Sequence, residues 1–387
     1  MCHHISAHRA TTLFVTALIA AVTWTIPAPA QAAEPDVPIP IPTGRFQLVF
    51  TPKNPELVAK REGMLADRQV AVNEISGDRK TQPCPKQAKG AVMPLTERDK
   101  QAIPRCWNAT DLSNAWRPQG ITGTADASPD NLYNGIQAFA VTSYHPITDH
   151  ARVTLLPNFA GQEYRHIRLV DAVAGGKSKP INCHAGGAVW YGNYLLVACT
   201  GTIAVFDWRK VYHPVGAPYE IIQVGSLDTK QKVQFSSLSL DRASNPPLLV
   251  VPEYHKECKG KGKRCRVIRF VLPIQPDDLP TRNSHKPIRA ADAYRHFYGS
   301  TQGVISHGDA FWFASSGGPA SNDPIGEHYG TLHSWRKGAE QARHYEWAYG
   351  AESITYWNRG DGTGEIVTVT EWPHYRVIAA VDIKHFP

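Results

Sequence analysis

The sequence predicts an all-β protein, a β-propeller with five blades that carries a small irregular and helical appendage at its N-terminus. A unit of short, β-rich apolar runs recurs five times between Trp116 and the C-terminus, and a strand-built repeat of this size is typical of a propeller. The chain of 387 residues is also 42% hydrophobic, enough for one large core. The five units begin at Gln119-Gly120-Ile121, Gly186-Gly187-Ala188, Ser236-Ser237-Leu238, Gln302-Gly303-Val304 and Glu352-Ser353-Ile354.

The spacing of these starts is uneven. Successive Gly or Ser markers are about 50 or about 67 residues apart, whereas common propeller repeats take roughly 40 to 50 residues. Two of the units therefore carry insertions. A β-sandwich in which the repeats are coincidental is the alternative.

Residues 1–32 are predicted to be a secretory signal peptide. An apolar stretch from Thr11 to Trp24 follows Arg9, and Ala30-Gln31-Ala32 has the pattern of a cleavage site. We therefore expect a secreted, extracellular protein, cleaved after Ala32. No later segment of the sequence is apolar and long enough to span a bilayer.

Residues 33–115 are predicted to be a proline-rich lead-in followed by an irregular cap. Prolines remove backbone donors from residues 33–44, which favours an extended chain. Residues 54–67 have a helical pattern with Pro55 in the first turn. The fifth unit has three strands, so we expect residues 45–50 to supply its fourth strand and close the ring, because an open array would leave exposed edges.

Residues 116–387 are predicted to form the propeller itself. Hairpin turns separate short apolar runs most clearly in units two, four and five. The expected inner strands are 184–190, 194–199 and 202–207 in unit two, 303–306, 310–314 and 330–335 in unit four, and 353–357, 365–370 and 376–383 in unit five. Units one and three fit more loosely, with strands at 137–143, 151–156, 248–252 and 266–272, and the expected outer strands are 164–170, 219–224, 288–294 and 343–348.

Six cysteines remain once Cys2 leaves with the signal peptide, and an even number in an exported protein suggests disulfides. Proximity in the chain favours Cys84 with Cys106, Cys183 with Cys199, and Cys258 with Cys265. Zinc is the weaker alternative because the sequence has no Cys-x-x-Cys pair. We predict no metal, and the sequence indicates no cofactor.

The formal net charge is +7, and a run of basic residues lies between Lys256 and Arg266. A short run of this kind is usually a solvated hairpin tip. It could instead attract an anionic glycan or a cell surface. Aromatic residues are not interleaved with the basic ones, so we expect no nucleic-acid partner. We expect a monomer.

Strand order predicts where function lies. In an antiparallel blade the first strand starts at the same end of the blade at which the second strand finishes. The residues at the starts of the first strands and those at the ends of the second strands should therefore ring one mouth of the central channel. The residues expected there include Gln119, His184, Ser236, Gln302 and Glu352 from the strand starts, and Tyr144, His145, Glu253, Tyr254, His255, Glu371, Trp372 and His374 from the strand ends.

Three carboxylates at this mouth are candidate catalytic groups. Glu253, Glu352 and Glu371 would face one cavity, and two carboxyl groups with separated proton affinities are what glycoside hydrolysis needs. The alternative is that each accepts hydrogen bonds from neighbouring loops.

His184 is a fourth catalytic candidate, because the Ala185-Gly186-Gly187 segment leaves room around it. The pairs Tyr144–His145 and Tyr254–His255 could move protons during β-elimination from a uronic acid. Trp372 could stack on a sugar, although rim aromatics more often serve packing. We expect Gln119, Gln302, Tyr144, His145, Tyr254, His255, Trp372 and His374 to bind substrate.

The segments starting Trp116-Arg-Pro-Gln-Gly-Ile and His184-Ala-Gly-Gly-Ala-Val-Trp-Tyr-Gly-Asn-Tyr, together with Val205-Phe-Asp, resemble exported actinobacterial propeller-like proteins without an assigned function. The resemblance covers the chain from Trp116 onward and implies the fold and export, but no catalytic residue. The leading hypothesis is thus an exported propeller that binds a glycan at the channel mouth and cleaves it as a hydrolase or lyase. A non-catalytic binding or scaffold propeller with a protein or cell-surface partner is the competing hypothesis.

Overall fold

The computed structural model describes residues 36–387 except 103, 158–162, 230, 232, 260–264, 280–285, 318–327 and 361–362. Residues 35–387 form one compact unit. The predicted signal peptide, residues 1–32, lies outside the described residues. Every helix in the described part is too short or too polar to cross a bilayer.

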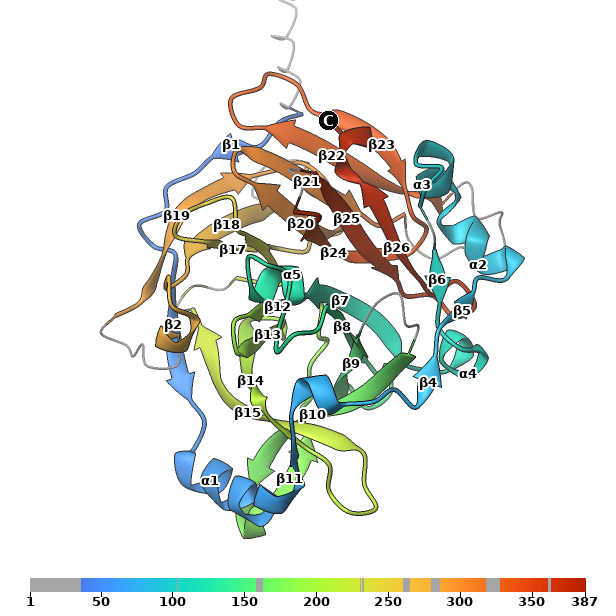
Figure 1. Ribbon diagram of the computed structural model, residues 1–387. Helices are drawn as coiled ribbons and strands as arrows, with labels where there is room; N and C mark the ends of the chain where they lie inside the picture. The colour runs from blue at the N-terminus through green and yellow to red at the C-terminus, as the bar shows by residue number, and fades with distance from the viewer. Residues whose placement is uncertain are drawn as a thin grey trace, which may run out of the picture. The chain divides into compact units, whose positions relative to one another are not determined.

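Antiparallel pairing divides most of the described strands into five successive groups, as expected for a β-propeller (Figure 1). The first strand of each group contacts the first strand of the next, and β24 returns to β7, so the groups form a ring. The all-β propeller class predicted from the sequence is confirmed. The first group is β7 (Arg117–Gly123), β8 (Ala138–Tyr144), β9 (Ala151–Pro157) and β10 (Glu163–Val173), and the second is β12 (Ala188–Tyr191), β13 (Tyr194–Ala198), β14 (Thr202–Tyr212) and β15 (Tyr219–Asp228). The third group is β16 (Ser239–Asp241), β17 (Leu248–Pro252), β18 (Arg266–Val271) and β19 (Ile288–Arg295), and the fourth is β20 (Thr301–His307), β21 (Ala310–Ser315), β22 (Gly330–Arg336) and β23 (Arg343–Trp347). The fifth group is β24 (Ala351–Asn358), β25 (Gly364–Thr370) and β26 (Val377–Asp382), with β6 (Arg105–Cys106) from the N-terminal segment as its outer strand. The pairings of β10 with β15 and of β2 (Gln47–Pro52) with β15 and β19 join the first three groups into one continuous sheet.

The small residues that mark each unit pack against one another around the axis of this ring. A Cβ atom on Gly120 would come within 2.7 Å of the Cα of Gly187, and one on Gly187 would come within 2.5 Å of the Cα of Ser237. The hydroxyls of Ser237 and Ser353 form a 2.9 Å hydrogen bond. Larger side chains would not fit at this level. The small residues therefore recur because close packing around the axis requires them. A cavity lies at each end of this axis.

The last group is closed by the N-terminal segment, but not by the strand that the sequence suggested. Residues 45–50 belong to β2 (Gln47–Pro52), which pairs with β15 and β19 on the second and third groups. The outer strand beside β26 is β6, which pairs in turn with β5 (Gln82–Pro83). The prediction of a closing strand at 45–50 is wrong because the fifth group recruits a two-residue strand that carries no sequence signal of its own.

The N-terminal segment runs around the outside of the ring, where Figure 1 draws it from blue to cyan. Its short strands pair in turn with blades three, two, one and five. The predicted helix at 54–67 is confirmed as α1. The elements of this segment include β1 (Ile39–Pro40), α1 (Pro55–Met64), β3 (Gln69–Val70), β4 (Arg79–Lys80), α2 (Lys86–Ala91), α3 (Met93–Arg98) and α4 (Ala109–Ser113). The other elements among the described residues are α5 (Thr124–Ala127), β11 (Lys177–Pro180) and short 3₁₀ turns.

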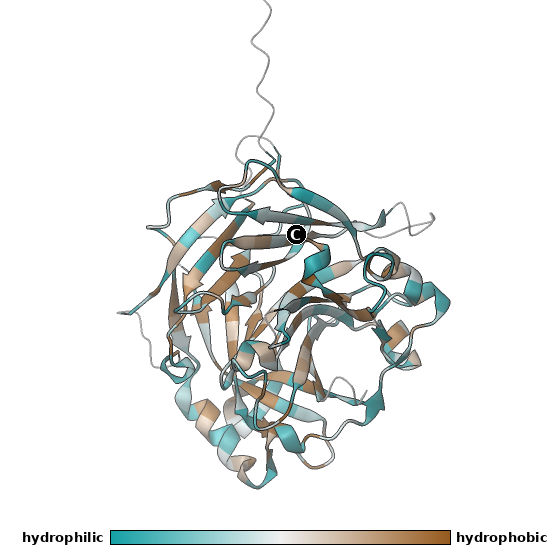
Figure 2. Ribbon diagram, turned by 45° about the horizontal axis from the view of Figure 1, so that its top comes forward, coloured by the Kyte–Doolittle hydropathy of each residue, from teal (hydrophilic) through white to brown (hydrophobic). Residues whose placement is uncertain are grey.

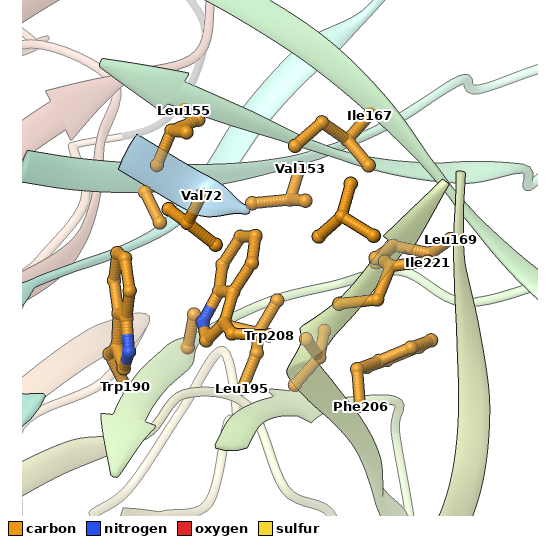
Figure 3. Packing of buried hydrophobic residues seen from close by; sticks show 14 of the residues in the cluster. Val72, Val153, Leu155, Ile167, Leu169, Trp190, Leu195, Phe206, Trp208 and Ile221 are labelled. Carbon is orange, nitrogen blue, oxygen red and sulfur yellow. The ribbon is translucent and has the colours of Figure 1, made fainter. Parts of the chain in front are cut away.

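The core lies between neighbouring blades rather than in one central mass. Between the first two blades the indoles of Trp190 and Trp208 stack with centroids 4.7 Å apart, and Val72 of the N-terminal segment packs into the same cluster (Figure 3). Figure 2 shows hydrophobic residues concentrated along the strands, whereas the outer helices carry both hydrophilic and hydrophobic residues. This burial stabilises each blade against its neighbours.

The three predicted disulfides are confirmed: Cys84–Cys106, Cys183–Cys199 and Cys258–Cys265. They fit an oxidising, extracellular setting. Cys84–Cys106 holds the segment that closes the fifth blade, and Cys183–Cys199 joins two loops at one end of the axis.

Candidate functional site

A pocket of about 400 Å³ lies at the end of the axis where the first strand of each blade begins. This is the mouth that the sequence predicted. It contains side-chain amides, hydroxyls, an imidazole and two aromatic rings. Its lining residues are Gln119, His184, Gly186, Thr200, Gln234, Phe235, Ser236, Tyr254 and Gln302.

The loops of the second blade are held rigidly at this pocket. Cys183 and Cys199, the disulfide partners, immediately precede His184 and Thr200 in the chain. Thr200 has a φ of 43°, a left-handed conformation that a β-branched residue rarely adopts. Strain of this kind persists only where the surroundings enforce it. The disulfide thus fixes two of the pocket's walls.

Two of the three predicted carboxylates meet beside this pocket. Glu352, on β24, is 1% exposed, and Glu371, which follows β25, is 7% exposed. Their side chains form a hydrogen bond with each other. Burial raises the pKa of both groups, and the charge of Glu371 raises the pKa of Glu352 further, to well above its usual value. Glu352 is therefore the partner that keeps the proton and donates it to the carboxylate of Glu371.

Two glutamines bind this carboxyl pair. The Nε2 of Gln119 donates to Oε2 of Glu371, and the Nε2 of Gln302 donates to Oε1 of Glu352, each at 3.1 Å. The same Nε2 of Gln119 also donates to the carbonyl of Pro118 at 3.0 Å. Carboxylate and carbonyl oxygens accept only, so these partners fix which end of the Gln119 amide is nitrogen.

Tyr144 lies against His184 rather than against His145. The rings of Tyr144 and His184 are 4.1 Å apart between centroids, whereas His145 packs edge-on against Trp116 at 5.4 Å. Burial raises the pKa of the Tyr144 hydroxyl. The rings of Tyr144 and His145 thus pack against different partners, and the proposed proton transfer by this pair stays a prediction.

Burial lowers the pKa of His184, which favours the neutral imidazole. A neutral imidazole can both donate and accept a hydrogen bond. His184 lines the pocket and is itself exposed, so it is suited to contact a ligand hydroxyl.

Glu253 has different hydrogen-bond partners from those of Glu352 and Glu371. It is 2% exposed, and both of its carboxylate oxygens accept from the guanidinium of Arg266. Its Oε1 also accepts from the backbone NH of Gln234. The expectation that Glu253 joins the other carboxylates is not met, because Arg266, on the neighbouring strand β18, neutralises it.

The other predicted binding residues divide between the pocket and its surroundings. Tyr254 lines the pocket, whereas the Nε2 of His255 is buried. The guanidinium of Arg117 lies 5.1 Å from the ring centroid of Trp372 and covers one of its faces. His374 is exposed, and its backbone NH binds the carbonyl of Leu112.

Arg117, which no sequence pattern singled out, reaches three of the candidate residues. Its Nη1 lies 3.5 Å from the hydroxyl of Tyr144 and 3.9 Å from Oε2 of Glu371, in addition to the contact with Trp372. Its position two residues before Gln119 was a usable signal, because residues next to a unit start lie at the mouth. Gln234 and Phe235, which also line the pocket, were missed as well.

No group of three or more His, Cys, Asp or Glu side chains suited to a metal ion occurs in the described ranges.

No protein-family model matches the sequence, and no curated protein is significantly similar to it. Solved structures show weak likeness. A GH43_1 enzyme from Xanthomonas citri complexed with xylose is 9% identical, with a TM-score of 0.35 over 76% of this chain and 92% of that one. A glycoside hydrolase family 43 arabinoxylan arabinofuranohydrolase from Bacillus subtilis in complex with cellotetraose is 10% identical, with a TM-score of 0.32 over 70% of this chain and 64% of that one.

The Pan2 WD40 domain of Neurospora crassa is 10% identical, with a TM-score of 0.30 over 69% of this chain and 95% of that one. Likeness at this level assigns no activity. The resemblance to actinobacterial propeller-like proteins stays a prediction.

Proposed function

We propose that the protein binds a carbohydrate chain in the pocket at the mouth of the axis. The pocket presents amide and hydroxyl groups together with the rings of Phe235 and Tyr254. Sugars offer hydroxyls that both donate and accept, and apolar ring faces that pack on aromatic side chains. A volume of about 400 Å³ suits one or two sugar residues.

The orientation of the Gln119 amide carries this proposal. Both of its hydrogens are directed to acceptors, Glu371 and the carbonyl of Pro118, so the carbonyl oxygen remains for a ligand. A group held in place before binding loses little entropy when a hydroxyl donates to it. The carboxyl pair thus acts as the support that positions a binding residue.

Cleavage of the bound chain is a second candidate function, supported by the division of one proton between Glu352 and Glu371. One carboxyl group holds the proton as an acid would, and the other is the base. Glycoside hydrolysis needs such carboxyl groups at roughly 5 to 9.5 Å so that the substrate or a water fits between them. The direct hydrogen bond therefore has to break before these residues can act, so we rank binding first.

The test of binding is calorimetric titration of the protein with neutral and uronic-acid oligosaccharides. The proposal expects saturable binding of at least one neutral glycan and at least tenfold weaker binding by Gln302→Leu. Gln341→Leu, at an exposed position of the fourth blade, is the matched control and should bind as the wild type does. Absence of binding across the panel, or equal affinities for wild type and Gln302→Leu, would reject the proposal.

Cleavage is tested on the same panel by assaying reducing ends. Reducing ends without new ultraviolet absorbance indicate a hydrolase, whereas new absorbance indicates a lyase. Equal rates for wild type and Glu352→Gln would remove Glu352 from any mechanism.

A further inference from the structure

A second cavity, of about 180 Å³, lies at the opposite end of the axis, where the first strands of the blades finish. The ring of small marker residues, in which Gly120, Gly187 and Ser237 touch, separates it from the glycan pocket. Its walls come from blades one, three, four and five. They are formed by Ala125, Asp126, Pro129, Asn131, Leu240, Arg242, Ala243, His307, Tyr356 and Asn358.

Opposite charges line this cavity without neutralising each other. Asp126 is 2% exposed, and its Oδ2 accepts from the hydroxyls of Thr122 and Thr355 at 2.7 and 3.1 Å. The guanidinium of Arg242 binds the backbone carbonyl of Asp126 through Nε and Nη2 instead of its carboxylate. The carboxylate of Asp126 and the guanidinium of Arg242 therefore do not bind each other. An unpaired charge in buried surroundings destabilises the folded protein.

A buried acceptor in the same wall has no hydrogen-bond partner in the described part of the chain. Asn131 is 8% exposed, its Nδ2 donates to the carbonyl of Asn358, and its Oδ1 is buried without a hydrogen bond among the described residues. Leaving a buried acceptor unsatisfied destabilises the folded protein. A hydrogen-bond donor on a bound molecule would satisfy this oxygen.

Asp126 can supply a negative charge at neutral pH. Burial raises its pKa to about 6, against the opposing effects of the Thr122 hydrogen bond and the charge of Arg242. Burial also lowers the pKa of Arg242. The cavity thus combines a carboxylate, a guanidinium and an amide oxygen in a volume suited to a small molecule.

We propose that this cavity is a binding site for a small zwitterion, a free α-amino acid. The ammonium group would donate to Asn131 Oδ1 and the Asp126 carboxylate, and the ligand carboxylate would accept from the Nη1 side of Arg242. A side chain of one or two carbons would contact Ala125 and Leu240. This assignment does not depend on glycan binding, because the marker ring separates the two cavities.

The test is a titration of the whole protein with glycine and L-alanine, followed by NMR or calorimetry at pH 7.5. Glycolate, which lacks the ammonium group, and glycinamide, which lacks the carboxylate, are the matched ligands. The proposal expects saturable binding of an amino acid and at least tenfold weaker binding of both analogues. No saturation by either amino acid at about 50 mM, or equal binding of the analogues, would overturn it.

Two variants locate the binding. Arg242→Met should weaken amino-acid binding at least tenfold, whereas Arg336→Met, at an exposed arginine of β22, should leave it unchanged. Asn131→Gly suits the φ of 63° at that position and removes the unsatisfied oxygen, so it provides a second test if Arg242→Met does not fold. Wild-type affinity in a folded variant of either residue would contradict the proposal, and both variants should keep the wild-type affinity for glycans.

Discussion

The side-chain amide of Gln119 donates a 3.1 Å hydrogen bond to the carboxylate of Glu371, although the two residues are 252 positions apart in the chain. The bond joins the first strand of the first blade to the loop after β25 in the last blade. It therefore couples closure of the ring to the arrangement of the pocket. Gln302 and Glu352 repeat the same chemistry between the fourth and fifth blades.

Glu352→Gln should make the protein more stable at alkaline pH. Burial and the charge of Glu371 raise the pKa of Glu352 well above its usual value of 4.5. The stability contributed by the protonated group is complete below the unfolded pKa and is lost as the pH rises through the raised, folded pKa. The amide has no proton to lose, so the variant should lack this decline.

Urea unfolding of wild type and Glu352→Gln across about pH 5 to 9 measures this difference. Parallel pH profiles for the two proteins would show that Glu352 does not hold the shared proton.

Asp111→Ala should destabilise the protein by about 3–5 kcal/mol, because it leaves buried partners without their acceptor. Asp111, on α4, accepts from the hydroxyl of Tyr164 at 2.7 Å, Nε2 of His166 at 3.1 Å and Nη1 of Arg79 at 3.2 Å. Burial alone would raise its pKa, but the hydrogen bond and charge of His166 hold the pKa of Asp111 well below 3.8. Denaturant unfolding at neutral pH measures the loss.

The same aspartate should contribute to acid sensitivity. Its pKa is depressed by folding, so its stabilisation is present above the unfolded value of 3.8 and is lost as the pH falls. The exposed Asp67 provides the control, and Asp67→Ala should change stability by less than about 1 kcal/mol. A similar small effect for Asp111→Ala would show that α4 is not anchored through this residue.

Glu253→Gln should lower stability without lowering the glycan affinity of the folded protein. The substitution replaces the buried ion pair between Glu253 and Arg266 by a neutral hydrogen bond, and breaking a buried ion pair costs about 3–5 kcal/mol. Thermal unfolding and glycan titration of the same sample separate the two effects. Unchanged stability together with lost affinity or activity would assign Glu253 to the site instead.

Removal of the Cys183–Cys199 disulfide by a double Ser substitution should weaken both stability and glycan binding. The bond lies beside His184 and Thr200, which line the pocket, and loss of a native disulfide typically costs about 2–5 kcal/mol. The double Ser variant of Cys258 and Cys265 is the matched control and should reduce stability alone. Equal glycan affinity of the two variants at a temperature where both are folded would exclude a role in positioning the pocket.

Local patterns in the sequence were enough to predict the fold class, the helix α1, the three disulfides and the end of the axis where polar residues gather. Turns, apolar runs and short cysteine spacings act over a few residues, so they can be read from one chain. Gln119 and Gln302 were placed at the mouth for the same reason, since strand order alone puts the unit starts there.

Long-range choices could not be read in this way. The two-residue strand β6 has no pattern that identifies β26 as its partner, and only the folded ring shows that it closes the fifth blade. Nothing local distinguishes Glu253, which pairs with Arg266, from Glu371, which meets Glu352. These differences depend on which side chains converge after folding, and they decide which carboxylates share the proton.

The affinity of Gln119→Met for the best-bound oligosaccharide tests the central claim most directly. Methionine has nearly the length of glutamine but supplies no carbonyl acceptor to the pocket. The account predicts at least tenfold weaker binding by a variant that remains folded at the titration temperature. Wild-type affinity in that variant would contradict the claim that the mouth of the axis is the glycan site.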